Sequence, residues 1–490
     1  DSDKFKISLH PTDIGQQVVL ELDSNSKISL SNNDEGSSNT FLGHSVAANH
    51  DANSSFNTFI GHAVAGGATM NDADDNVAIG FESMKALTSG DDNVAVGMRT
   101  LLDINTGARN TALGDSAGRS VTSGTDNVFV GSTAGNNTTT ATENVFVGAG
   151  AGDDTNASQS VFVGAAAGGT ANNGAAANTY IGYNAGANDS AHHGGKNVAI
   201  GHNTAKSQTT AAKNVIIGFE AAQPNTRDGL VIIGSQAGKS LSSGDNNVFV
   251  GFNTGPGVTT GDHNTLVGDE AGRDLAGGSS HTTLIGLNAG LKINTNGDTN
   301  CTLVGSEAGN DITSGTNNTG IGVGTRFADT SNNQTCLGVG ATTDSANDIA
   351  IGNTSVDEIK GQVSFSTFSD ERIKKNIVDG DLGLDFINLL KPRKFNKVNP
   401  AEYPDSIKKE TDGKYGDWTE AQDTKVWDGL IAQEVKSAMD TCGTTFSGWN
   451  EETNSKQVVT YESLVVPLIK AVQELSVEIT NLKAQVSGSN

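Results

Sequence analysis

Short apolar strings recur along most of the chain, each closed by a glycine and separated from the next by polar residues. The first string, NTFLG, covers Asn39–Gly43 and the last, DIAIG, covers Asp348–Gly352. Nineteen copies occur, with their glycines 14 to 19 residues apart and most often 17. Linkers such as TSGDDN carry turn-forming residues just before the next string. A period near 17 is too short for two helices and a turn, so the pattern predicts one β-coil per repeat over residues 37–352.

Both faces of each predicted strand are apolar. The second residue is mostly Val or Thr and the fourth Ile, Val or Leu, whereas the third is mostly Phe, Ala, Leu, Ile or Tyr. Such strands are typical of parallel stacks that are covered on both sides. One face would fill the coil interior, and the other needs a partner, which a bundle of three coils supplies. The glycine permits a positive φ or a close backbone approach, and a spacing of ~4.8 Å per coil predicts a rod of roughly 90 Å.

The repeats resemble two known kinds of coil. Strings of the N-V-A-I-G and N-T-F-I-G type, often followed by Ala-Gly as at Ala134-Gly135 and Ala271-Gly272, are similar to the left-handed parallel β-roll of trimeric autotransporter adhesin heads. They are also similar to repeats in phage tail fibres. The resemblance implies a mainly β fold, a trimeric parallel β-roll or β-solenoid of about 17-residue coils. Residues 1–36 are expected to form a β lead-in or connector.

Composition and charge agree with thin cores stacked in series. The chain has 61 glycines among 490 residues and only 5% aromatic residues, less bulk than one thick core needs. Its net charge is −25, and residues 1–368 hold 36 acidic against 16 basic side chains. An acidic shaft is unsuited to nucleic acid or anionic lipid. No run approaches the ~20 apolar residues of a membrane span, so membrane insertion is not expected.

Neither a metal nor a cofactor is predicted. Cys301, Cys336 and Cys442 lack metal-ligand spacing and are interpreted as small apolar fillers. Asp-rich turns such as Asp91-Asp92 match no complete calcium loop. Histidines follow the strand glycine at equivalent coil positions and are interpreted as surface side chains, with a ligand site between copies as the alternative: His44, His62 and His202.

The pattern changes after Gly352, where helical periodicity, prolines and tryptophans replace the coil repeat. We divide this part into a neck, residues 353–368, and a terminal domain, residues 369–490. Its motifs are SDERIKKNI from Ser369, KPRKF from Lys391, GLIAQEV from Gly429 and a terminal apolar run. Together they resemble the intramolecular chaperone domain of phage endosialidases, tail spikes and tail fibres, over about residues 366–486. The resemblance implies a small α+β chaperone domain that ends in a coiled coil.

The resemblance also implies self-cleavage by a Ser–Lys dyad, in which Ser369 is the nucleophile and Lys374 the general base. The cut would fall between Phe368 and Ser369, in a single turnover without an external substrate. A serine hydroxyl needs a base to become a nucleophile, and a lysine can serve once burial lowers its pKa. Asp370 and Arg372 also fit the motif and are interpreted as supporting residues.

Two alternatives stay open at this site. Ser369 could be a helix N-cap, because Asp370 and Glu371 after it suit the positive end of a helix. Lys375 could replace Lys374 as the base, although the family spacing favours Lys374.

The end of the chain has the apolar spacing of a coiled coil, which we place at residues 461–486. Apolar residues recur at alternating steps of three and four, at Val465, Leu468, Val472, Leu475, Ile479, Leu482 and Val486. β-branched residues at a with Leu at d lean toward two strands, so the expectation of three rests on the family and on the coil repeat. A packed amphipathic helix is the alternative. Pro467 is tolerable only near the first helical turn.

These features predict a trimeric phage tail fibre or tail spike, located in the virion, which binds a glycan or protein receptor on the host surface. Its chaperone would drive trimerisation, and cleavage would leave the fibre kinetically trapped. Other tail proteins would join through a short or missing N-terminal region, because the chain starts at Asp1 without a methionine. The alternative is a bacterial cell-surface adhesin or structural filament with the same terminal chaperone, and a glycan-cleaving spike is less favoured.

Overall fold

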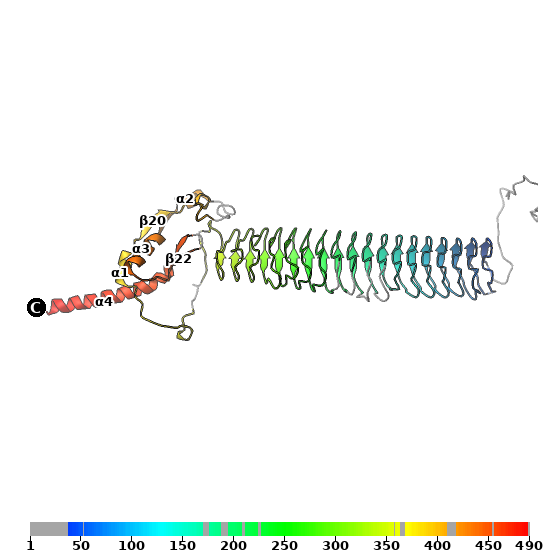
Figure 1. Ribbon diagram of the computed structural model, residues 1–490, viewed down its shortest axis with the longest axis horizontal. Helices are drawn as coiled ribbons and strands as arrows, with labels where there is room; N and C mark the ends of the chain where they lie inside the picture. The colour runs from blue at the N-terminus through cyan, green and yellow to red at the C-terminus, as the bar shows by residue number, and fades with distance from the viewer. Residues whose placement is uncertain are drawn as a thin grey trace, which may run out of the picture. The chain divides into compact units, whose positions relative to one another are not determined.

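The computed structural model describes residues 38–51, 53–169, 176–187, 195–207, 211–223, 227–356, 358–362, 368–408, 418–452 and 455–488. The predicted lead-in at residues 1–36 lies outside these ranges. The chain divides into two compact units, Asp1–Asn156 and Ala157–Asn490. Figure 1 shows the short strands of each unit standing in a row and the labelled helices in the C-terminal part of the second unit.

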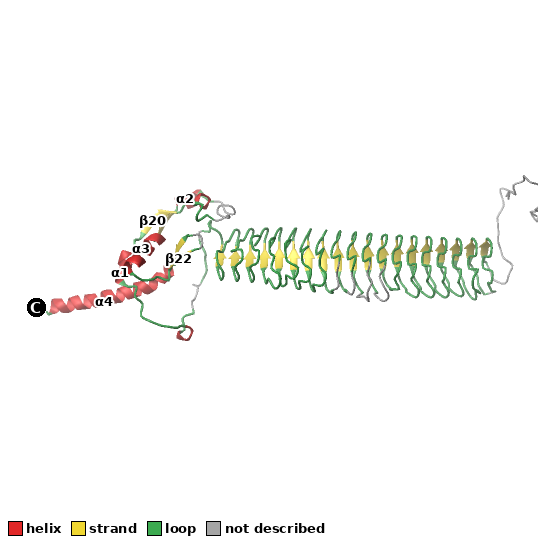
Figure 2. Ribbon diagram, viewed as in Figure 1, coloured by secondary structure: helices red, strands yellow, loops and turns green. Residues whose placement is uncertain are grey.

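Each sequence repeat forms one short strand of a parallel β-solenoid, which confirms the predicted fold class (Figure 2). The first unit contains β1 (Thr40–Leu42), β2 (Thr58–Ile60), β3 (Val77–Ile79), β4 (Val94–Val96), β5 (Thr111–Leu113), β6 (Val128–Val130) and β7 (Val145–Val147). The second unit contains β8 (Val161–Val163), β9 (Thr179–Ile181), β10 (Val198–Ile200), β11 (Val215–Ile217), β12 (Val231–Ile233), β13 (Val248–Val250), β14 (Thr265–Val267), β15 (Thr283–Ile285), β16 (Thr302–Val304), β17 (Thr319–Ile321), β18 (Thr335–Leu337) and β19 (Ile349–Ile351). Within each unit, consecutive strands pair in parallel and in equivalent register, as Val94 does with Thr111.

The central residue of each strand fills the coil interior. Phe129, Phe146 and Phe162 are fully buried at this position, and smaller residues such as Ala112 are buried there in other coils. The residues on either side of the central one point outward, because side chains alternate between the faces of a strand. Leu113, the last residue of β5, is 49% exposed, for example. The two apolar faces seen in the sequence are therefore a filled interior and an outer face that the chain itself leaves partly uncovered.

A ladder of buried asparagines runs beside the strands. Asn110 donates its backbone N–H and its side-chain amide to the Oδ1 of Asn93 in the preceding coil, both at 3.0 Å. The same amide donates to the Gly124 carbonyl in the next coil at 2.9 Å. Asn127 repeats these contacts on Asn110. Each amide thus satisfies buried polar groups of both neighbouring coils, which explains why asparagine so often precedes the strand.

The glycine after each strand is required by a close backbone approach. Gly114 has φ +135°, and a Cβ built there would lie 2.6 Å from the carbonyl oxygen of Gly131 in the next coil. Neither backbone can move without disturbing its own coil. A side chain at this corner would therefore force adjacent coils apart.

The C-terminal module combines short strands with helices. It contains η1 (Glu371–Ile373), α1 (Leu384–Leu389), β20 (Arg393–Asn396), η2 (Pro400–Glu402), α2 (Glu420–Thr424), β21 (Val426–Gly429), α3 (Ala432–Cys442), β22 (Trp449–Glu451), β23 (Gln457–Val459), η3 (Tyr461–Leu464) and α4 (Val465–Ser487). β20 pairs antiparallel with β21, and β22 with β23. Phe386, Val435, Ala438, Met439 and Phe446 form its buried core. The predicted α+β character is confirmed.

The terminal helix starts later than the residue 461 that we expected for the coiled coil. Residues Tyr461–Leu464 form the single 3-10 turn η3, and α4 begins at Val465. Pro467 is the third residue of α4, where its missing N–H breaks no helical hydrogen bond, as the sequence required. Pro467 and Ala471 are the buried residues of this helix.

Candidate functional site

The segment that carries the predicted dyad folds back through a single tight turn. η1 occupies Glu371–Ile373, and its N-cap is Asp370, whose carboxylate accepts the backbone N–H of Arg372 at 2.9 Å. The alternative reading of Ser369 as the N-cap is therefore wrong, because the aspartate one residue later takes that position. This turn lies between Ser369 and Lys374.

The structure brings the predicted nucleophile and base together. Lys374 Nζ donates to Ser369 Oγ at 2.7 Å. When the amine is neutral, the same distance lets it accept the hydroxyl proton. The contact is made by Lys374, the residue favoured by the family spacing. The geometry suits the proposed chemistry, and the catalytic roles themselves stay predictions.

An ion pair between Asp370 and Arg372 stabilises the turn between the two dyad residues. The Arg372 guanidinium donates to both Asp370 carboxylate oxygens, at 2.9 and 2.7 Å. These hydrogen bonds lower the pKa of the Asp370 carboxyl and raise the pKa of Arg372. Both groups are therefore charged near neutral pH and bound to each other. This arrangement suits the supporting role that the sequence assigned to them.

The whole dyad segment is exposed in the single chain. Residues 368–380 are all exposed, and the Phe368 side chain retains 92% of its accessible surface. The described part of this chain does not supply the burial that a catalytic lysine requires. Any cover for the dyad must come from outside the described residues of one chain.

Two sequence motifs of the module meet in an ion pair that the sequence reading did not predict. Arg393, from KPRKF, donates from Nε to Glu434 Oε2 at 3.0 Å and from Nη2 to Glu434 Oε1 at 2.5 Å. Glu434 belongs to GLIAQEV. The hydrogen bonds from Arg393 lower the pKa of the Glu434 carboxyl. Because one residue lies on β20 and the other on α3, the pair fixes these elements against each other. The sequence offers only the opposite charges of the two motifs, which do not show that these residues meet.

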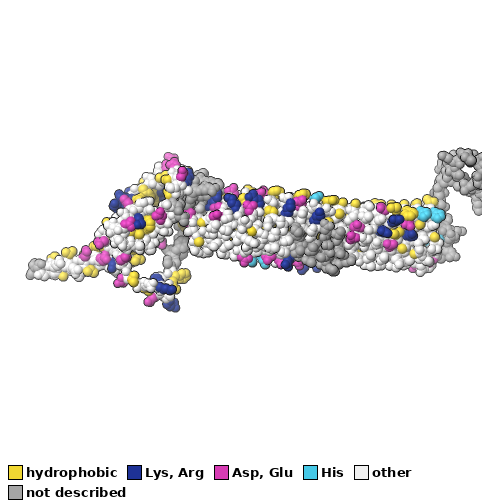
Figure 3. Space-filling model, in the orientation of Figure 1, with side chains coloured by type: hydrophobic (Ala, Val, Ile, Leu, Met, Phe, Trp, Pro, Cys, Tyr) yellow, Lys and Arg dark blue, Asp and Glu magenta, His cyan; other side chains and the backbone are white. Residues whose placement is uncertain are grey.

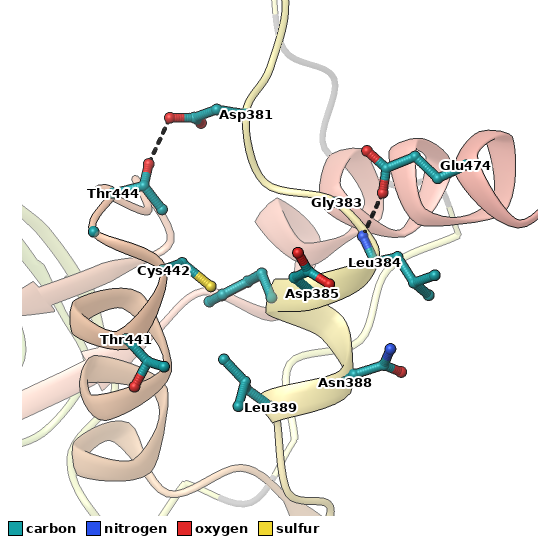
Figure 4. Close-up of a pocket in the computed structure, with 12 residues that line it drawn as sticks. Asp381, Gly383, Leu384, Asp385, Asn388, Leu389, Thr441, Cys442, Thr444 and Glu474 are labelled. Carbon is teal, nitrogen blue, oxygen red and sulfur yellow. Dashed lines mark hydrogen bonds between the residues drawn. The ribbon is translucent and has the colours of Figure 1, made fainter.

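The first half of α4 is held by the rest of the module. Glu474 Oε2 accepts the backbone N–H of Leu384 at 2.7 Å, which caps the start of α1 (Figure 4). Nearby, Thr444 Oγ1 donates to Asp381 at 2.6 Å (Figure 4). All four of these residues line one pocket of the module. The pocket is lined by residues of α1 and of the C-terminal end of α3 together with Glu474 of α4, and these two hydrogen bonds join lining residues to each other. The Glu474 contact ties α4 to the start of α1.

The apolar seam of α4 stays largely exposed among the described residues of the chain. The exposed fractions are 52% for Val465, 46% for Leu468, 63% for Val472, 41% for Leu475, 49% for Ile479, 59% for Leu482 and 70% for Val486. A helix packed on its own domain would bury these residues. The alternative of an intramolecularly packed amphipathic helix is therefore wrong for this seam, because the intramolecular contacts use Pro467 and Ala471 instead.

Cysteines and histidines form no further site in the described residues. Cys301 and Cys336 are buried free thiols, and burial raises the pKa of each to about 11, as suits packing residues. His44 stacks on His62 at a ring-centroid distance of 5.1 Å. Within the described ranges, no group of three or more His, Cys, Asp or Glu side chains could hold a metal ion. None of the described helices has the length and hydropathy needed to cross a bilayer.

Comparison with known proteins finds a match within the C-terminal module. Residues 369–444 match the family model described as chaperone of endosialidase. No curated protein and no solved structure matches the chain. The matched residues begin at Ser369, include the Arg393–Glu434 pair and end just after α3. The chain thus carries a chaperone of endosialidase domain after a parallel β-solenoid, which supports a trimeric, tail-fibre-like protein with a C-terminal chaperone.

Proposed function

We propose that this protein is a trimeric tail fibre or tail spike of a phage, in which α4 brings three chains together and the module is then released by self-cleavage. The exposed seam of α4 carries this proposal. Seven apolar residues at heptad spacing are 41–70% exposed in one chain, and such a seam is stable in water only against other helices.

The solenoid presents a second uncovered apolar surface. Its exposed large hydrophobic residues occupy the outward strand positions or the position just after the strand glycine, with Phe56 as the exception among the described coils. A row of hydrophobic side chains follows one edge of the coils in Figure 3. The exposed large hydrophobic residues at these strand and post-glycine positions are Leu42, Ile79, Phe81, Met98, Leu113, Val145, Val161, Ile181, Tyr183, Phe219, Ile233, Phe252, Ile285, Leu287, Ile321, Val323, Val339, Ile349 and Ile351. Three chains side by side would cover this surface.

A chaperone at the C-terminus solves a folding problem posed by such coils. Each coil buries little surface until its neighbours are stacked, and parallel β-structure forms slowly. Three chains held in register at one end need no further search for each other. The solenoids can then grow from that end as a bundle.

The chemistry proposed for release uses only this chain's residues and water. Lys374 takes the proton of Ser369 Oγ, and the oxygen attacks the Phe368 carbonyl carbon. The bond from that carbon to the Ser369 nitrogen breaks, and the nitrogen takes a proton to become an amine. Water then hydrolyses the ester to a carboxylate at Phe368 and a free Ser369 hydroxyl. Because nucleophile and carbonyl are adjacent in the chain, their effective molarity is high.

Neighbouring copies are the proposed source of cover for the dyad. Burial would disfavour the lysine ammonium and leave the neutral amine that the reaction needs. Cleavage would then follow assembly rather than precede it. The finished fibre would lose the piece that guided its folding and become kinetically trapped.

The place of action follows from the same proposal. The fibre would lie in the virion, attached to other tail proteins at its N-terminal side, and would contact a glycan or protein receptor on the host surface. The resemblance of the coils to adhesin heads supports a second candidate, a bacterial surface adhesin or filament. Binding of the purified fibre to host cells or to a glycan array would separate the two.

Intact-mass measurement after denaturing electrophoresis tests the cleavage. We expect one fragment that ends at Phe368 and one that begins at Ser369. Ser369→Ala and Lys374→Ala should each leave the chain at full length, whereas Lys375→Ala, the matched control, should still cleave. A wild-type chain that stays whole after prolonged incubation as a trimer would contradict the dyad, and the module would then be a permanent trimerisation domain.

A further inference from the structure

Two charged residues near the end of α4 lie on either side of its apolar seam. With Val465, Val472 and Ile479 at position a of the heptad, Glu478 occupies position g and Lys483 occupies position e of the following heptad. Both side chains are exposed. Positions e and g flank the seam in a coiled coil, where oppositely charged residues form salt bridges between helices.

Neither charge has an ion-pair partner in the described part of its own chain. Lys470 and Glu474, one turn earlier, contact each other at 3.8 Å, whereas Glu478 and Lys483 have no ion-pair partner among the described residues. They cannot pair with each other, because residues five apart point about 140° away from each other around a helix. The residues three and four positions from each of them carry no opposite charge. Within α4 itself, neither residue therefore has a partner, and a second copy of the helix is the source of charge considered next.

A second copy of α4 offers the complementary charge in only one arrangement. In parallel helices without a shift, a residue at g lies beside the neighbouring residue at e five positions later in the sequence. Glu478 of one copy therefore meets Lys483 of the next. A shift of one heptad would place Ser476 opposite Glu478 instead. In an antiparallel pair g faces g, so Glu478 would meet a position such as Ala471 or Gln485.

We propose that Glu478 of each chain pairs with Lys483 of a neighbouring copy, and that these pairs set the parallel direction and the register of the three helices. The inference rests on the trimer proposed above. The apolar seam supplies the affinity but repeats every heptad, so it accepts shifted neighbours almost as well. The charge pair does not repeat along the described helix. It aligns the three chains at the same residue, as side-by-side packing of their solenoids requires.

Charge reversal and its restoration test the proposal. The full chain is used with Ser369→Ala, so that fragments do not complicate the measurement, and the trimer dissociation midpoint is measured by sedimentation over a dilution series. Glu478→Lys and Lys483→Glu should each raise the concentration at which the trimer is half dissociated by about tenfold, because three exposed pairs become like-charge contacts. The double variant should return to the parent value. Ala484→Lys, an outward-facing control at position f with no charged residue three or four positions away, should leave the value unchanged.

The possible results separate this inference from the function on which it rests. A parent chain that is monomeric at all concentrations would overturn the trimer, and the pairing with it. A trimeric parent with all variants equal would overturn the pairing and leave the trimer standing. Weakening by both single variants without recovery in the double variant would also overturn it, because loss without rescue indicates general damage rather than a specific pair.

Discussion

The solenoid and the C-terminal module both leave apolar surface uncovered, but they are held together in different ways. In the solenoid, each coil bonds mainly to the coils before and after it, through parallel strands and an asparagine ladder such as Asn93–Asn110–Asn127. The module depends on contacts between distant residues, such as Arg393 with Glu434 and Leu384 with Glu474. The first is a repetitive array and the second has one small core around Phe386.

The difference indicates that the two parts have different functions in assembly. A repetitive array stores its stability in many equivalent contacts, so it tolerates local damage but has no unique register. The module has few contacts, yet its α4 seam and charges define how copies meet. We infer that specificity is concentrated in the module and durability in the solenoid. The predictions below test that division.

The largest effect is expected from a charge in the α4 seam. Ile479→Asp would place three carboxylates in an apolar seam, where burial of unpaired charge is prohibitive. We expect complete loss of the trimer at micromolar concentration, measured by sedimentation. Thr480→Asp, the adjacent exposed residue away from the seam, is the control and should stay trimeric. A trimeric Ile479→Asp chain would show that α4 is not the element that joins the copies.

The two cores should respond differently to the same truncation. Phe146→Ala and Phe386→Ala each remove a buried ring, at a cost of about 3–5 kcal/mol. In the module this should unfold the domain and prevent assembly. In the solenoid the loss should be confined to coils near β7, so limited proteolysis should show new cuts there while distant coils stay protected. Unfolding of the whole solenoid by Phe146→Ala would contradict the view of it as an array.

Removing one asparagine of the ladder should lower the free energy of unfolding less than removing a buried ring of the core. Asn110→Ala leaves the buried Asn127 backbone N–H and the Gly124 carbonyl without their partner, so we expect a loss of about 1–3 kcal/mol. Chemical denaturation followed by circular dichroism would measure it. Asn71→Ala, an exposed asparagine in the same unit, should change stability little, and an equal effect at both sites would argue against a structural ladder.

The smallest effect is expected from the exposed Arg393–Glu434 pair. The pKa of Glu434 is lower in the folded chain than its ordinary value of 4.5. The contribution of the ion pair to the free energy of unfolding is therefore complete above pH 4.5. It is lost as pH falls through the lowered folded pKa, because protonation then breaks the pair. Glu434→Gln should slightly weaken the module at pH 7 and remove this part of its acid sensitivity. Urea midpoints at pH 7 and below pH 4.5 would measure both, and parallel pH profiles for the two chains would contradict the assignment.

Much of the fold could be predicted from the sequence because the repeat is periodic. The strand positions follow directly from strings such as NVFVG, and the α4 seam follows from its heptad spacing. The asparagine ladder was not predicted, since side-chain bonds between coils depend on exact stacking. The structure places the N-cap at Asp370 and not at Ser369, which the sequence left open as an alternative, because both residues are good caps and only the backbone decides between them. The ion pair of Arg393 with Glu434 joins residues 41 apart in the sequence, and no local pattern indicates which distant charges meet.

The mass of the intact assembly tests the central claim most directly. Native mass spectrometry of the full chain with Ser369→Ala requires no receptor, host or cleavage. The account predicts one species at three times the 50.2 kDa mass of the chain. A species at the mass of a single chain, stable across the working concentration range, would contradict it.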